Sequence, residues 1–137
     1  MALLEIKDLS VEFQTPRGWQ RALDGMSLTV ERGQTVALVG ESGSGKSITG
    51  LSILQLLNYP AARHPDGSSI TYEGRQLVGA DQATMRDIRG DDISMIFQEP
   101  MSSLNPLHTI ERQISESLIL HQGMDRSAAR GLSLIHI

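Results

Sequence analysis

The sequence predicts an α/β fold with an antiparallel β-subdomain at its N-terminus. Hydrophobic and polar residues alternate over the first thirty positions, which is typical of antiparallel strands with one solvated face. A continuous apolar run at 35–39 and a second strand-like segment at 92–97 are typical of parallel strands buried on both faces. Segments with helical spacing follow both, so strands and helices alternate as in an α/β core.

The first half of the chain contains two turns, a buried strand and a helix. Turns are expected at Pro16–Gly18, between the first two strands, and at Glu31–Gln34, before the strand at 35–39. A helix is expected from Lys46 to about Leu57, because apolar residues occupy most of its circumference and Asn58–Pro60 stops it.

The second half is expected to contain, in this order, a surface loop at 61–69, a hairpin at 70–78, a helix at 81–89, the strand at 92–97, a loop at 99–106 and a helix at 109–121. Apolar residues four positions apart give the last helix one buried face, and Gly123 ends it. The four histidines show no metal-ligand spacing, so they are expected in loops or at the surface.

Composition excludes several classes of protein. The chain has 137 residues and no cysteine, which excludes disulfide scaffolds and thiolate metal sites. Its 12 basic and 16 acidic residues are interspersed, which argues against nucleic acid as a partner. No apolar run reaches the roughly 18 residues that cross a bilayer, and the N-terminus lacks the basic region of a signal peptide. We therefore expect a cytosolic protein, with attachment to a membrane partner left open.

A glycine-rich segment carries the clearest chemistry. It matches G-x-x-x-x-G-K-[ST] at every fixed position and lies between a predicted strand and a predicted helix, as a phosphate-binding loop must. Its residues are Gly40, Glu41, Ser42, Gly43, Ser44, Gly45, Lys46 and Ser47. Glycines let backbone amides converge on phosphate oxygens, and the helix N-terminus adds partial positive charge.

The side chains of this loop have separate expected roles. Lys46 can reach the β- and γ-phosphates, and the Ser47 hydroxyl is the expected ligand of Mg²⁺. The alternative is a helix-capping turn with a solvated lysine. The motif predicts a P-loop NTPase core, but it does not distinguish an ATPase from a GTPase or a small-molecule kinase.

A second segment carries a family resemblance. Residues 95–106, MIFQEPMSSLNP, closely resemble the Q-loop region of ABC-transporter ATPases of the oligopeptide/dipeptide importer type, as do the segments at 9–13 and 21–28. Within that family, 107–109 and 120–124 look most like the double-ATPase subunit of microcin C-type peptide importers. The resemblance covers about residues 3–131 and implies the start of a helical subdomain after the core.

The resemblance implies roles for further residues. Gln98 corresponds to the Q-loop glutamine, which in the family contacts Mg²⁺ or the attacking water and links the nucleotide site to the transmembrane subunit. Lys46 and Gln98 are therefore the two expected catalytic residues. Phe13 falls where the family stacks an aromatic side chain on adenine, and Trp19 is the other candidate. The alternatives are a solvent-facing strand end for Gln98 and a core position for Phe13.

The function implied is that of an ATP-binding subunit which couples ATP binding and hydrolysis to peptide uptake. Its implied cofactors are ATP and Mg²⁺. Its implied partners are transmembrane permease subunits, a second ATPase domain and, indirectly, a solute-binding protein, at the cytoplasmic face of the bacterial inner membrane. Two alternatives stay open: another P-loop enzyme, such as a nucleotide or metabolite kinase, and a nucleotide-binding fragment without catalysis.

The C-terminal part departs from the family. No Ser-Gly-Gly signature, acidic strand end or switch histidine follows Gln98, so the chain alone is expected to bind nucleotide with negligible turnover. Residues 1–131 are expected to form the N-terminal part of an ABC ATPase domain.

Residues 132–137 resemble a translated sequencing adaptor, which suggests a non-native tail on a truncated reading frame. The alternative for this tail is an apolar strand. Truncation would expose apolar surface and reduce solubility.

Overall fold

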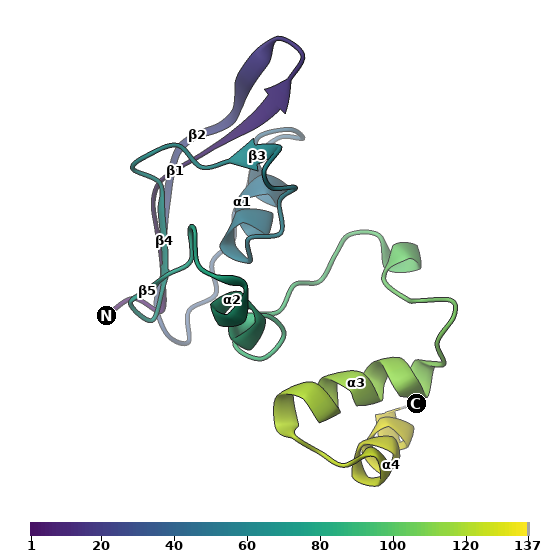
Figure 1. The fold of residues 1–137 in the computed structure, drawn as a ribbon. Coiled ribbons are helices and arrows are strands. Elements are labelled where there is room, and N and C mark those ends of the chain that lie inside the picture. Colours follow the sequence, from purple (N-terminus) through teal and green to yellow (C-terminus); the bar gives the residue numbers. More distant parts are fainter. Residues whose placement is uncertain (137) are drawn as a thin grey trace. The chain divides into compact units, whose positions relative to one another are not determined.

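The computed structural model describes residues 1–136 and contains two compact units, Met1–Arg86 and Asp87–Ile137. The first unit is built on an antiparallel sheet with strand order β2-β1-β4-β5, and β3 pairs with β1 as well (Figure 1). These strands are β1 (Leu4–Thr15), β2 (Gly18–Val30), β3 (Ala62–Arg63), β4 (Ser69–Tyr72) and β5 (Arg75–Gln76). The predicted antiparallel β-subdomain is thus confirmed.

The long hairpin of β1 and β2 is irregular at its centre. Register shifts separate the pairs Leu9↔Met26, Val11↔Leu23 and Glu12↔Arg21, so β2 carries extra residues there. Ser10 stabilises the irregular region, because its hydroxyl accepts a hydrogen bond from the amide of Gly25 at 2.9 Å. The core of the first unit lies under this hairpin and its neighbours, and consists of Ile6, Leu9, Val11, Leu23, Leu54, Ala62, Ile70, Tyr72, Leu77 and Met85.

Two helices complete the first unit. α1 (Lys46–Ile53) begins where the sequence predicts, but it is four residues shorter than expected. It ends early because Gln55 adopts a left-handed conformation with φ of 51°, so the chain turns before Asn58–Pro60. α2 (Gln82–Ile88) begins after Asp81, whose carboxylate accepts a hydrogen bond from the amide of Thr84 at 2.7 Å.

Two predicted strands are wrong. Residues 35–39 have no regular secondary structure and pair with no strand, and Val39 is 86% exposed. Residues 92–97 form only an isolated bridge between Ile93 and Arg89, and Ile96 is 99% exposed. A strand buried on both faces needs neighbours to pair with it and helices to cover it, and in residues 1–136 neither segment has a strand partner.

The loop predicted at 61–69 is wrong in part. Ala62 and Arg63 form β3 and pair with Phe13 and Glu12 of β1, and Ala62 is buried. The hairpin expected at 70–78 is confirmed by β4, β5 and the turn between them.

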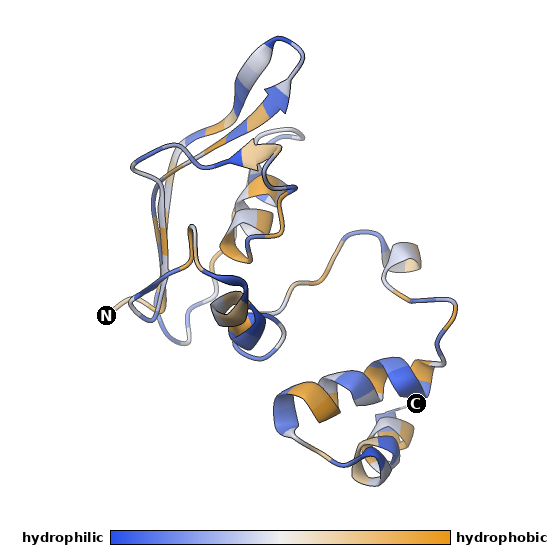
Figure 2. Ribbon diagram, in the orientation of Figure 1, coloured by the Kyte–Doolittle hydropathy of each residue, from blue (hydrophilic) through white to orange (hydrophobic). Residues whose placement is uncertain are grey.

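The second unit is a pair of helices that follows a long connection with a short 3₁₀ turn, η1 (Pro100–Ser102). α3 (Ile110–Gln122) matches the expected helix closely: the hydroxyl of Thr109 caps its first turn, and Gly123 ends it with φ of 62°. Figure 2 shows hydrophobic and hydrophilic bands alternating along α3.

α4 (Arg126–His136) packs on α3 through a face that includes the buried residues Ala129 and Ser133. An ion pair of 3.3 Å between Arg130 and Glu111 also joins the two helices. The strand considered for the C-terminal segment is therefore wrong, because residues 132–136 continue the helix. Within residues 1–136, no helix has the length and hydrophobicity that a membrane span requires.

Candidate functional site

The glycine-rich segment forms a tight loop that leads directly into α1. The amide of Ser44 donates to the carbonyl of Glu41 at 3.2 Å, which closes a turn at the tip of the loop. Gly43 and Gly45 have φ of 80° and 96°, which glycine adopts without the strain that a side chain would cause. The loop-to-helix context required of a phosphate-binding loop is present, although the strand predicted before it is not.

The loop wraps around the ammonium group of Lys46. This group donates to the carbonyl oxygens of Gly40 and Glu41 at 2.6 and 2.7 Å, and to the hydroxyl of Ser44 at 3.2 Å. All three acceptors are neutral, and none of the ion pairs found in residues 1–136 includes Lys46. The loop therefore holds a cation without a matching anion.

The first turn of α1 adds uncapped amides beside this cation. Gly45 is the N-cap residue and has no side chain that could accept a hydrogen bond from them. The first N–H groups of a helix lack intrahelical partners, and the helix dipole places partial positive charge there. Ser47 lies exposed on this turn, as do Glu41 and Ser42 on the loop. A ligand with several negatively charged oxygens fits these groups, as phosphates do.

Close packing fixes two of the glycines. A Cβ at Gly40 would lie 2.6 Å from the hydroxyl oxygen of Ser44, and one at Gly45 would lie 2.7 Å from Cδ1 of Leu23. Behind Gly45, the hydroxyl of buried Thr49 donates to the Gly45 carbonyl at 2.9 Å. The hairpin of β1 and β2 thus contacts the loop through Leu23.

The two candidate aromatic side chains lie on opposite faces of this hairpin. Phe13 pairs with Gln20 and Ala62, and Trp19 pairs with Gln14. Because side chains alternate along a strand, Phe13 shares its face with Val11, whose partner Leu23 supports the phosphate loop.

Trp19 lies on the other face and already has a partner. The guanidinium of Arg63 lies 4.0 Å above the centroid of its ring, so one ring face is covered. Glu12 holds that guanidinium by a 2.7 Å ion pair, and the hydrogen bond from Arg63 keeps the pKa of Glu12 below its usual value. The register therefore places Phe13, and not Trp19, on the face of the hairpin that contacts the glycine-rich loop through Leu23.

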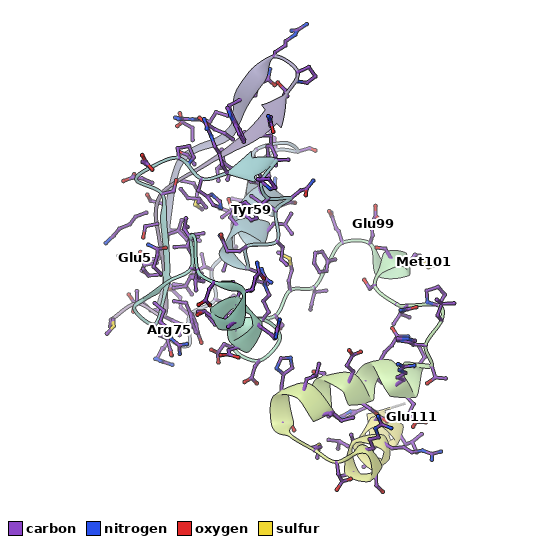
Figure 3. All side chains as sticks on the ribbon, viewed as in Figure 1. Glu5, Tyr59, Arg75, Glu99, Met101 and Glu111 are labelled. Atoms are coloured by element: carbon purple, nitrogen blue, oxygen red, sulfur yellow. The ribbon has the colours of Figure 1, made fainter. Side chains whose placement is uncertain are left out.

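Gln98 belongs to the second unit, where it is exposed and follows a segment without regular secondary structure instead of the predicted strand. The first unit brings the phosphate loop together with the face that carries Phe13. Beyond Gln98, the hydroxyls of Ser102 and Ser103 both donate to the carbonyl of Glu99, at 3.2 and 3.1 Å. Figure 3 labels Glu99 and Met101 at this turn.

Sequence patterns do not identify two polar residues that make several hydrogen bonds in the structure. The side chain of Gln113 accepts from the amide of Asn105 and donates to the carbonyls of Asn105 and His108, which clamps the turn before α3. His64, expected in a loop or at the surface, is partly buried, and both ring nitrogens have partners. No short-range pattern signals either residue. Within residues 1–136, no group of three or more His, Cys, Asp or Glu side chains is arranged to hold a metal ion.

Comparison with known proteins gives consistent matches. The sequence model described as ABC transporter matches residues 23–136. The peptidoglycan transport ATP-binding protein YejF of Agrobacterium fabrum is 53% identical over 132 residues, which cover 96% of this chain and 24% of that protein. The oligopeptide transport ATP-binding protein OppD of Bacillus subtilis is 42% identical, over 93% of this chain and 36% of that protein.

A solved structure shows the same fold. The dimeric post-hydrolysis state of the ATP-binding cassette MJ0796, bound to ADP and Pi, superposes with a TM-score of 0.79 at 23% identity. The match covers 96% of this chain and 54% of that one. The chain spans between 24% and 38% of the length of the curated relatives that it matches.

The packing at Gly45 gives a first prediction. Gly45→Ala places a Cβ against Leu23 and forces a side chain into a left-handed conformation, which costs about 1–3 kcal/mol for the backbone alone. Gly43→Ala, at φ of 80° with nothing within 4 Å, is the matched control and suffers only the backbone strain. Urea unfolding should show a larger loss for Gly45→Ala. Equal losses would contradict the support that Leu23 gives to the loop.

Proposed function

This chain belongs to the ABC transporter family, and we propose that its loop Gly40–Ser47 binds the phosphates of ATP as part of a subunit that energises peptide import. ATP is the nucleotide of this ATPase family. The observation that carries the proposal is the ammonium of Lys46, held only by neutral acceptors beside the uncapped start of α1. Phosphate oxygens supply the missing negative charge.

Each residue of the loop has a part in this proposal. The amides at the start of α1 and Lys46 hold the β- and γ-phosphates, and glycines leave room for close approach of the ligand. Ser47 is exposed on the first turn, where its hydroxyl is a hard oxygen ligand suited to Mg²⁺. When bound, Mg²⁺ neutralises phosphate charge. Gln98 is proposed as the second group at the metal and the attacking water, since its carboxamide both donates and accepts hydrogen bonds.

Peptides are the proposed class of cargo. The names of the relatives YejF and OppD refer to transport of peptidoglycan and of oligopeptides, and a third relative, from Brucella abortus, is described as a putative peptide import ATP-binding protein. We propose that this chain serves the same purpose by driving transmembrane permease subunits from the cytoplasmic face of the inner membrane. A solute-binding protein would deliver the cargo to those subunits.

A second ATPase domain is the other proposed partner. The solved cassette MJ0796 is described as a dimer in a state bound to ADP and Pi. Phosphoryl transfer needs several charged and polar groups in place at once, and the sequence after Gln98 offers no signature motif, acidic strand end or switch histidine. We therefore propose that the 137-residue chain binds ATP without appreciable turnover, and that hydrolysis requires groups beyond it.

Removal of the ammonium group tests the proposal directly. Lys46→Ala should weaken ATP binding by about tenfold or more, because a charge-assisted hydrogen bond is worth about 1.5–3 kcal/mol. Isothermal titration calorimetry with Mg²⁺ and ATP measures this loss. Lys7→Ala is the matched control, since Lys7 is an exposed lysine in β1 whose partner is Glu5. Equal affinity of Lys46→Ala and the unchanged chain would overturn the proposal.

The register of the hairpin gives a separate prediction. Phe13→Ala should weaken ATP binding several-fold, because stacking of a base on an aromatic ring is worth about 1–3 kcal/mol. Trp19→Ala, on the opposite face and covered by Arg63, should leave the affinity unchanged. Affinities for ATP and for inorganic triphosphate check the cause, since Phe13→Ala should alter only the first. A loss confined to Trp19→Ala would reverse the assignment.

A further inference from the structure

A hydrogen-bonded cluster around His64 joins three segments of the first unit. Nδ1 of His64 lies 3.1 Å from the carbonyl oxygen of Ser10 in β1. Nε2 lies 2.5 Å from the hydroxyl oxygen of Tyr59 and 3.4 Å from the side-chain nitrogen of Gln55. The rings of Tyr59 and His64 also contact each other, with centroids 5.6 Å apart. Figure 3 labels Tyr59 near α1.

The partners select one tautomer of the neutral imidazole. The carbonyl of Ser10 can only accept, so Nδ1 carries the hydrogen. Nε2 then offers a lone pair, to which the hydroxyl of Tyr59 donates. The amide of Gln55 presents its nitrogen to the same lone pair, and its orientation is fixed because that nitrogen also donates to the carbonyl of Ser52 at 2.6 Å. The cluster is therefore built for neutral histidine.

The cluster ties the far end of the phosphate-loop helix to the sheet. Ser52 lies in the last turn of α1, is fully buried, and its hydroxyl donates to the carbonyl of Ile48 at 2.7 Å. Through Gln55 and His64, this turn is connected to Ser10 of β1. At the other end of α1, Gly45 packs against Leu23 of β2. The helix that presents Lys46 and Ser47 is thus held at both ends.

We propose that neutral His64 is a positioning residue for the phosphate loop, so that nucleotide binding and protonation of His64 oppose each other. The inference rests on the proposed function, because it concerns the affinity of the same loop. A proton on Nε2 would face the fixed amide hydrogens of Gln55, and it would require the hydroxyl of Tyr59 to reverse. The first of these changes weakens the link between α1 and β1, because that link runs through Gln55 and His64 to Ser10.

The electrostatic surroundings agree with this arrangement. Burial lowers the pKa of His64 below 6.5, and the hydrogen bond to Ser10 opposes the shift only in part. None of the ion pairs found in residues 1–136 includes His64. The charged group next to it in the chain, Arg63, is held by Glu12 and covers Trp19. Since the folded pKa is the lower one, His64 favours the folded state above pH 6.5 and less so as the pH falls.

The sign of a linked titration tests the proposal. The imidazole ¹⁵N signals of His64 report its protonation in the unaltered chain, with and without saturating ATP. Linkage is reciprocal, so the proposal requires ATP to lower the midpoint of His64. The direct effect of a nearby polyanion is the opposite, because negative charge favours the imidazolium and raises the midpoint. An unchanged or raised midpoint would overturn the proposal.

A variant gives the second arm of the test. His64→Gln keeps a donor and an acceptor but does not titrate, whereas His108→Gln is the matched control in the second unit. Between about pH 8 and about pH 5.5, ATP affinity of the unaltered chain and of His108→Gln should fall by about threefold or more relative to that of His64→Gln. This comparison removes the protonation of ATP itself, which is common to all three.

The proposed function and the role of His64 are overturned by different results. If the unaltered chain binds no ATP at about pH 8, the proposed function fails, and the role of His64 fails with it. If the chain binds ATP but His64→Gln shows the same pH dependence as His108→Gln, only the role of His64 is overturned. The titration of the unaltered chain needs no variant, so it decides the matter even where His64→Gln does not fold.

Discussion

The constraint on which the structure depends is the closing of a short loop around a positive charge. The chain must turn sharply at Gly43 and Gly45, and it must bring the carbonyls of Gly40 and Glu41 to the ammonium of Lys46. Only neutral groups accept hydrogen bonds from that ammonium, so its charge has no ion-pair partner among the described residues. The proposed binding of phosphate follows from this arrangement, since an anion would pair with the ammonium of Lys46.

The rest of the first unit holds this loop in place. The irregular centre of the β1–β2 hairpin places Leu23 against Gly45, where an added Cβ would lie 2.7 Å from Cδ1 of Leu23. At the other end of α1, the His64 cluster attaches the last turn to β1. An eight-residue helix is only marginally stable by itself. These two attachments therefore supply the stability that helix propensity does not. The proposed nucleotide site therefore depends on contacts with the sheet as well as on the helix.

The sequence predicted the features that depend on neighbouring residues, and it failed where distant ones decide. The start of α1 after the glycine-rich loop and the end of α3 at Gly123 are set by neighbouring residues, and the structure has both. The segments at 35–39 and 92–97 have strand-like composition, but a strand forms only with partners, which neither has in residues 1–136. The cluster at His64 depends on Ser10, 54 positions away. Likewise, only the observed register separates Phe13 from Trp19.

The most direct test of the central claim is an NMR titration of the chain with inorganic triphosphate, which carries the charge of ATP without its base. The backbone amide signals of residues 43–48 and the ammonium signal of Lys46 should shift together and saturate, whereas adenosine should leave them unchanged. Two outcomes would contradict a nucleotide site formed by Lys46 and the uncapped start of α1. One is that the shifted signals lie outside residues 43–48, and the other is that the shifts appear with adenosine but not with triphosphate.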